Sequence, residues 1–127
     1  MFDVVIVGLG PVGSAAAIQF ASAGLQVAVV ERDPEIYQLP RAVMMDGEIV
    51  RGFQRIGLGD DLASLLQPTR EGERAGFSNS NREWLFGQDF VSFASNGWAP
   101  INMFHQPEVD GYLRENAIAH ANVTAFL

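Results

Sequence analysis

The opening of the chain alternates apolar runs with a run of small residues. Residues 2–7 (FDVVIV) and 27–30 (VAVV) are apolar and rich in β-branched side chains, which is typical of strands that a parallel sheet buries on both faces. Between them, residues 14–23 are helix formers with many alanines. The pattern therefore predicts a β-α-β unit over residues 2–31.

Further along the chain, the spacing of apolar residues changes several times. Two prolines and mixed polarity predict a loop over residues 32–40. Helical spacing predicts three helices, at residues 46–56 with Asp46 as N-cap, at residues 60–66 before Pro68, and from residue 106 onward. Residues 74–78 and 82–86 predict a hairpin, residues 88–103 a loop with a possible strand, and residues 122–127 a buried strand.

A glycine motif, GLGPVG at residues 8–13, joins the first predicted strand to the first helix. Gly8 allows a tight turn, Gly10 leaves space for a pyrophosphate beside the backbone, and Gly13 lets the helix pack closely on the strand. Pro11 suits the first helical position, which has no N–H partner to lose. Unpaired N–H groups and the helix dipole favour an anion there, so the motif predicts a dinucleotide site.

The second predicted strand ends in an acid, Glu31. It lies about 20 residues beyond the glycines, where a carboxylate accepts hydrogen bonds from the two hydroxyls of an adenosine ribose. Because a carboxylate also repels a ribose phosphate, Glu31 favours FAD or NAD over NADP.

Composition limits the remaining functional classes. A length of 127 residues corresponds to one domain, and the net charge of −7 argues against nucleic acid or an anionic membrane as partner. There is no cysteine, and the only histidines, His105 and His120, are far apart, so we expect neither a disulfide nor a metal site. Without a basic leader or an apolar run of the ~20 residues that span a bilayer, we expect a cytoplasmic protein.

Four segments together resemble a known family. GLGPVG, Glu31-Arg32, LPRAV at residues 39–43 and FHQP at residues 104–107 are similar to the N-terminal part of the single-component FAD-dependent aromatic hydroxylases. Residues 34–43 most resemble the 3-(3-hydroxyphenyl)propionate hydroxylase type. The similarity covers the whole chain but only the first part of such an enzyme. It implies a monooxygenase that uses NADH or NADPH and oxygen to hydroxylate a phenolic or other aromatic substrate through a flavin hydroperoxide.

The same resemblance implies roles in FAD binding for particular residues. The glycine motif and its helix hold the pyrophosphate, Glu31 holds the adenosine ribose, and Arg32 covers the adenine. Arg41 lies along the phosphate or ribityl region, and Gln106 hydrogen-bonds the ribityl or pyrophosphate portion from the other side. Arg32 can equally be a solvated or acid-paired arginine, and Gln106 a helix cap. The predicted cofactor-binding set is Gly8, Gly10, Pro11, Val12, Gly13, Glu31, Arg32, Arg41 and Gln106, with no catalytic residue and no metal ligand.

These observations predict an α/β fold class, namely a truncated Rossmann-like FAD-binding fold. Its parallel sheet contains the βαβ dinucleotide unit, and it carries a small antiparallel β insertion. Residues 1–127 then form the N-terminal part of the FAD-binding domain, with the βαβ unit at 2–31, the arginine loop and helices at 32–68, the hairpin insertion at 70–104, and a helix and strand at 106–127.

Two later family motifs and the substrate domain have no counterpart in this sequence, so we expect the chain alone to be inactive. An exposed last strand and an open sheet edge predict a homo-oligomer or a missing C-terminal portion. Two alternatives stay open, namely another FAD- or NAD-dependent oxidoreductase, and a truncated or degenerate nucleotide-binding module without catalysis.

Overall fold

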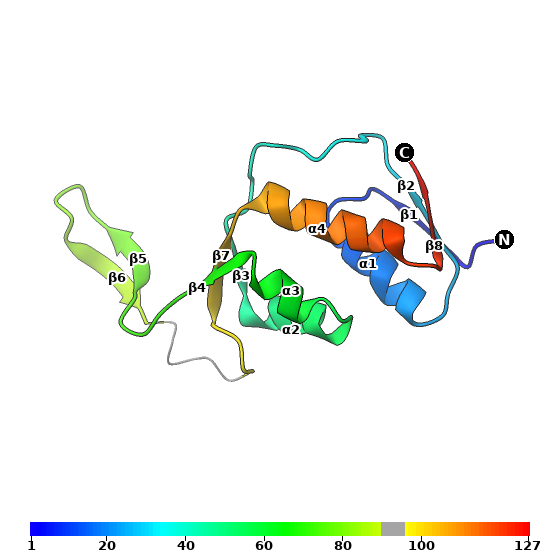
Figure 1. Ribbon diagram of the computed structural model, residues 1–127. Helices are drawn as coiled ribbons and strands as arrows, with labels where there is room; N and C mark the ends of the chain where they lie inside the picture. The colour runs from blue at the N-terminus through cyan, green and yellow to red at the C-terminus, as the bar shows by residue number, and fades with distance from the viewer. Residues whose placement is uncertain (90–95) are drawn as a thin grey trace.

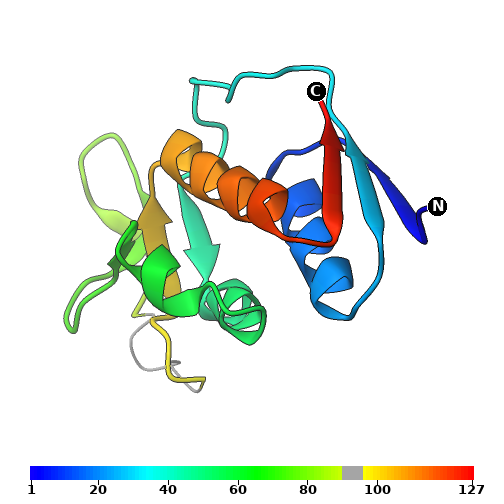
Figure 2. The same ribbon diagram turned by 45° about the vertical axis from the view of Figure 1, so that its right-hand side comes forward.

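The computed structural model describes residues 1–89 and 96–127, and its body is a parallel sheet covered on one face by two helices. The sheet has the strand order β1 (Val4–Val7), β2 (Val27–Val30), β8 (Val123–Phe126). The helices α1 (Pro11–Ser22) and α4 (Gln106–Ala119) pack against each other on that face (Figure 2). The predicted α/β fold with its βαβ unit is therefore confirmed.

Small side chains make this packing possible. Ala17 and Ala21 of α1 are buried in one cluster with Leu113 and Ala117 of α4, so the two helices can approach closely while their larger residues fill the space above the sheet. Val29 of β2 is fully buried in the same cluster. Full burial of a valine or leucine side chain such as these contributes roughly 1.5–3 kcal/mol to the stability of the fold.

A second, antiparallel sheet lies beside this body, with the order β3 (Met44–Asp46), β7 (Ile101–Phe104), β4 (Leu66–Pro68). The helices α2 (Gly47–Arg55) and α3 (Gly59–Ala63) connect β3 to β4 (Figure 1). The Asp46 carboxylate accepts a hydrogen bond from the Ile49 backbone N–H at 2.9 Å, which confirms the predicted N-cap.

The second sheet also corrects two sequence predictions. No strand was expected at residues 44–46, and the helix expected over residues 60–66 ends at Ala63, after which Leu66 begins β4. Strands of three residues are too short to show a pattern of alternating apolar and polar residues in the sequence. They form because each pairs with β7, which is distant in sequence.

A hairpin of β5 (Ala75–Ser78) and β6 (Trp84–Gln88) projects from the body (Figure 1) and confirms the predicted antiparallel pair. The Asn79 side-chain oxygen accepts hydrogen bonds from the backbone N–H groups of Asn81 and Glu83 at 2.9 and 3.0 Å, which holds the turn. Large apolar side chains on both strands are exposed, among them Phe77 and Phe86. The part of the expected loop at residues 90–95 lies outside the described residues.

The sequence predicted strands buried on both faces, and this is wrong for the other face of the parallel sheet, which is apolar and uncovered in the described chain. Val5, Val7, Val30 and Phe126 lie on it and are exposed, and Phe2 packs edge-on against Phe126 with ring centroids 6.2 Å apart. Across residues 1–89 and 96–127, no helix is long and apolar enough to span a membrane.

Gly13 offers a test of the contact between α1 and the turn that precedes it. A Cβ atom at Gly13 would lie 2.0 Å from the Gly8 carbonyl oxygen, so we expect Gly13→Ala to lower the free energy of unfolding by about 2–3 kcal/mol in urea titrations. Gly111→Ala is the matched control. A Cβ there meets nothing within 4 Å, and the substitution should raise stability by roughly 0.5 kcal/mol. Equal effects of the two changes would contradict the close contact.

Candidate functional site

The glycine turn between β1 and α1 is held on both sides. Gly8 has a φ of +103°, which L side chains rarely adopt, and its N–H donates to the Val30 carbonyl of β2 at 2.8 Å. Gly13 lies directly against the Gly8 carbonyl, which confirms the predicted close packing of helix on strand. The turn is therefore fixed relative to both β2 and α1.

The N-terminus of α1 is open toward solvent. Gly10 is the N-cap residue and Pro11 follows it, and no side chain of the described residues caps this helix end. A Cβ at Gly10 would meet nothing within 4 Å. The first-turn N–H groups are thus available to an anion that approaches over Gly10.

Glu31 lies beside this helix end, with its side chain only 13% exposed. Its Oε2 accepts a hydrogen bond from the Leu9 N–H at 2.6 Å and its Oε1 accepts one from the Asp33 N–H at 2.8 Å. These bonds, led by that from Asp33, lower the pKa of Glu31 below its ordinary value of 4.5. The ionised carboxylate keeps further lone pairs for the hydroxyls of a ligand.

Arg114 of α4, which the sequence analysis missed, ties the parts of the site together. Its Nε donates to the Leu9 carbonyl at 3.2 Å, and its Nη1 donates to the carbonyls of Asp33 and Pro34 at 3.2 and 3.0 Å. Its Nη2 lies 3.9 Å from the Glu31 carboxylate. The available signal was its position eight residues after Gln106, on the same face of a helix.

Gln106 supports the loop between β2 and β3, residues 31–43, which we call the arginine loop. Its Oε1 accepts hydrogen bonds from the backbone N–H groups of Arg41 and Ala42 at 2.7 and 2.9 Å, and its Nε2 donates to Asp110 Oδ2 at 3.2 Å. The side chain does not cap α4. Its acceptor is therefore turned toward the loop backbone, and this sets the position of Arg41.

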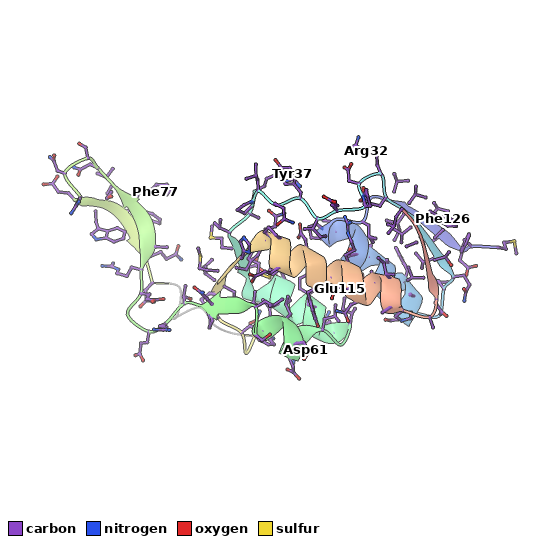
Figure 3. All side chains as sticks on the ribbon, turned by 45° about the horizontal axis from the view of Figure 1, so that its top comes forward. Arg32, Tyr37, Asp61, Phe77, Glu115 and Phe126 are labelled. Carbon is purple, nitrogen blue, oxygen red and sulfur yellow. The ribbon has the colours of Figure 1, made fainter. Side chains whose placement is uncertain are left out.

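The remaining predicted residues fall into different surroundings. The Arg41 guanidinium stacks over the Tyr37 ring, 4.9 Å from the ring centroid. Arg32 is 90% exposed and pairs with Asp33 at 3.1 Å, and it points away from the body (Figure 3). Val12 is exposed at the start of α1. Arg32 is thus separate from the group around Gly10.

Two hollows meet at the start of α1. The smaller one, about 130 Å³, brings together four predicted residues, and its lining includes Gly10, Pro11, Glu31, Arg41, Asp110 and Arg114. The larger one is an apolar groove of about 500 Å³, and its lining includes Pro11, Val12, Ala42, Met45, Phe53, Gln106 and Asp110. We call them the acidic hollow and the apolar groove. An anion site at a helix end, an anchored carboxylate and a supported arginine loop together suit an elongated nucleotide.

Comparison with known proteins gives consistent matches. A sequence profile for the family described as FAD binding domain matches residues 1–126. A probable NADH-specific resorcinol 4-hydroxylase of Rhodococcus jostii is 34% identical over 113 residues, which are 89% of this chain and 21% of the relative. A 3-(3-hydroxy-phenyl)propionate/3-hydroxycinnamic acid hydroxylase of Mycolicibacterium smegmatis is 37% identical over 111 residues, which are 87% of this chain and 19% of the relative.

A solved structure agrees with these matches. The p-nitrophenol 4-monooxygenase of Pseudomonas putida superposes with a TM-score of 0.83 at 26% identity, and the match covers 97% of this chain and 31% of that one. The chain thus spans about a fifth of the length of these curated relatives.

Glu31 allows a test of the hydrogen bonds that hold the site. Because its pKa is lowered on folding, its stabilising effect is present above about pH 4.5 and is lost as the pH falls through the folded-state pKa. We expect Glu31→Gln to reduce the free energy of unfolding by about 1–2 kcal/mol at pH 7, and by less at pH 3.5, as measured by urea unfolding. Glu115→Gln, on the exposed side of α4 (Figure 3), should have little effect at either pH. A Glu31→Gln effect independent of pH would count against this account.

Proposed function

This chain belongs to the FAD binding domain family, and we propose that it is the N-terminal, FAD-binding part of an aromatic-ring hydroxylase. The observation that carries the proposal is the acidic hollow, where the uncapped start of α1 and the anchored Glu31 lie side by side. A dinucleotide needs both an anion site and a ribose acceptor, next to each other at one edge of a parallel sheet.

The residues present fit FAD. The open space over Gly10 leaves the first turn of α1 accessible to a diphosphate, and the ionised Glu31 can accept the ribose hydroxyls. Arg41, whose backbone Gln106 fixes, can place a positive charge along the ligand. When bound, FAD supplies the redox chemistry, since it takes electrons from NADH or NADPH and activates oxygen for transfer to an aromatic ring.

The task of this chain is to bind and orient the cofactor. We propose a phenolic substrate for the longer protein, in line with the names of the curated relatives, and NADH or NADPH as reductant. Because the chain covers only about a fifth of those relatives, we propose that residues outside it form the substrate site, and that the chain alone does not hydroxylate. A cytoplasmic location is part of the same proposal.

FAD titration of the purified chain tests the proposed function, with flavin fluorescence as the readout and NAD as competitor. We expect saturable FAD binding. Gly10→Val should weaken it about a hundredfold, because the added side chain occupies the space over the helix N-terminus that a diphosphate needs. Its Cβ meets nothing within the chain, so the melting temperature should stay close to that of the unchanged protein.

The outcomes separate the alternatives. Preference for NAD over FAD would support a different dinucleotide oxidoreductase, and binding of neither nucleotide would support a module that has lost the site. If Gly10→Val binds FAD as tightly as the unchanged chain, the diphosphate does not bind at the start of α1.

We also propose that the 127-residue chain self-associates through its exposed apolar side chains. Phe77 and Phe86 face each other across the hairpin and are 72% and 58% exposed, and exposed apolar patches favour association. Light scattering at tens of micromolar should show oligomers, fewer in the double variant Phe77→Ser with Phe86→Ser. A monomer at these concentrations would contradict the proposal.

A further inference from the structure

Helix α4 carries three polar residues on the face that it turns toward the site. Gln106, Asp110 and Arg114 follow one another at intervals of four residues, so they lie on one face of the helix. Gln106 bonds to the arginine loop, and Arg114 bonds to the glycine turn and to the loop after Glu31. Asp110 lies between them, and its hydrogen bond from Gln106 involves only one of its two carboxylate oxygens.

Asp110 is almost fully buried, with 7% of its surface exposed. Its Oδ2 accepts the hydrogen bond from Gln106 Nε2 at 3.2 Å, but its Oδ1 is buried and has no hydrogen-bond partner among the described residues. Burial raises the pKa of Asp110, whereas the hydrogen bond from Gln106 and the charges of Arg41 and Arg114 act in the opposite direction. A buried carboxylate oxygen without a donor lowers the stability of a fold, so its presence calls for a function.

The position of Asp110 indicates what kind of donor is missing. Asp110 lines both the acidic hollow and the apolar groove, and Pro11 at the start of α1 lines both as well. A ligand that has its diphosphate at this helix end and continues into the apolar groove must therefore pass Asp110. A carboxylate repels a phosphate but accepts hydrogen bonds from hydroxyl groups, so the matching part of the ligand is a polyol next to the diphosphate.

We propose that Asp110 is a cofactor-binding residue whose free oxygen accepts a hydrogen bond from the sugar-alcohol chain that joins the diphosphate of FAD to its ring system. The inference rests on the proposed function, and it adds a residue that the motif around Gln106 did not indicate. Gln106 then has two effects, because it supports Arg41 from one end of its amide and orients Asp110 from the other.

Asp110→Asn tests this directly in the 127-residue chain. The asparagine can still accept the hydrogen bond from Gln106, but it loses the charged acceptor. FAD and ADP are titrated separately, because ADP has the diphosphate and the ribose but no sugar-alcohol chain. We expect the affinity for FAD to fall about tenfold, which corresponds to the loss of one charge-assisted hydrogen bond. The affinity for ADP should stay within about twofold or increase, because a negative charge near the phosphates is removed.

A second measurement separates ligand binding from a structural role. Without ligand, Asp110→Asn should melt at the same temperature as the unchanged chain or higher, because the buried charge is removed while the Gln106 contact is kept. Glu115→Gln, on the exposed side of the same helix, serves as the control and should change neither affinity nor melting temperature.

Each other outcome overturns the inference. A lower melting temperature, or equal losses for FAD and ADP, would make Asp110 a structural residue. If the unchanged chain binds FAD and Asp110→Asn binds it equally well, the inference fails and the proposed function stands. If the unchanged chain does not bind FAD at all, the proposed function fails and the inference fails with it.

Discussion

The direct contact of helix α1 with the glycine turn is the constraint on which the site depends. No side chain fits at Gly13, because its Cβ would overlap the Gly8 carbonyl, and Gly8 needs a backbone conformation that other residues rarely adopt. The two glycines together fix where α1 begins. Its first N–H groups therefore lie at the end of β1, next to the end of β2, where Glu31 follows. The uncapped start of α1 and the Glu31 carboxylate are adjacent because this packing contact fixes the turn between them.

Helix α4 turns this local geometry into a site. Arg114 bonds to the carbonyl of Leu9 in the turn and to the loop beyond Glu31, while Gln106 bonds to the backbone of Arg41 and Ala42. One rigid helix thus sets the distance between the glycine turn and the arginine loop. Asp110, buried between the two, has an oxygen to which none of the described residues donates a hydrogen bond. The loops around the site have no regular structure, and they are held in place because α4 presents hydrogen-bonding side chains to them from positions eight residues apart.

The uncovered surfaces of the chain agree with its share of the relatives' length. The face of the parallel sheet that carries Val5, Val7 and Phe126 is exposed, and so is the apolar hairpin of β5 and β6. A two-stranded hairpin is only marginally stable by itself, and apolar surface of this kind favours association. These exposed apolar surfaces belong to a chain that spans about a fifth of the length of its curated relatives.

Local sequence determined the βαβ unit, the Asp46 cap, the hairpin, helix α4 and the last strand, because apolar strand runs, helix capping and turn chemistry are properties of neighbouring residues. It also predicted that Gly13 would pack closely against the turn at Gly8 and that Glu31 would follow the second strand. Only the tertiary structure decided that residues 44–46 and 66–68 are strands, since their pairing with β7 spans distant parts of the chain. It likewise decided that Arg32 turns outward to Asp33, that Gln106 supports Arg41, and that Asp110 and Arg114 join the site. Gln106, Asp110 and Arg114 acquire these roles through packing of α4 on the sheet, which no local pattern encodes.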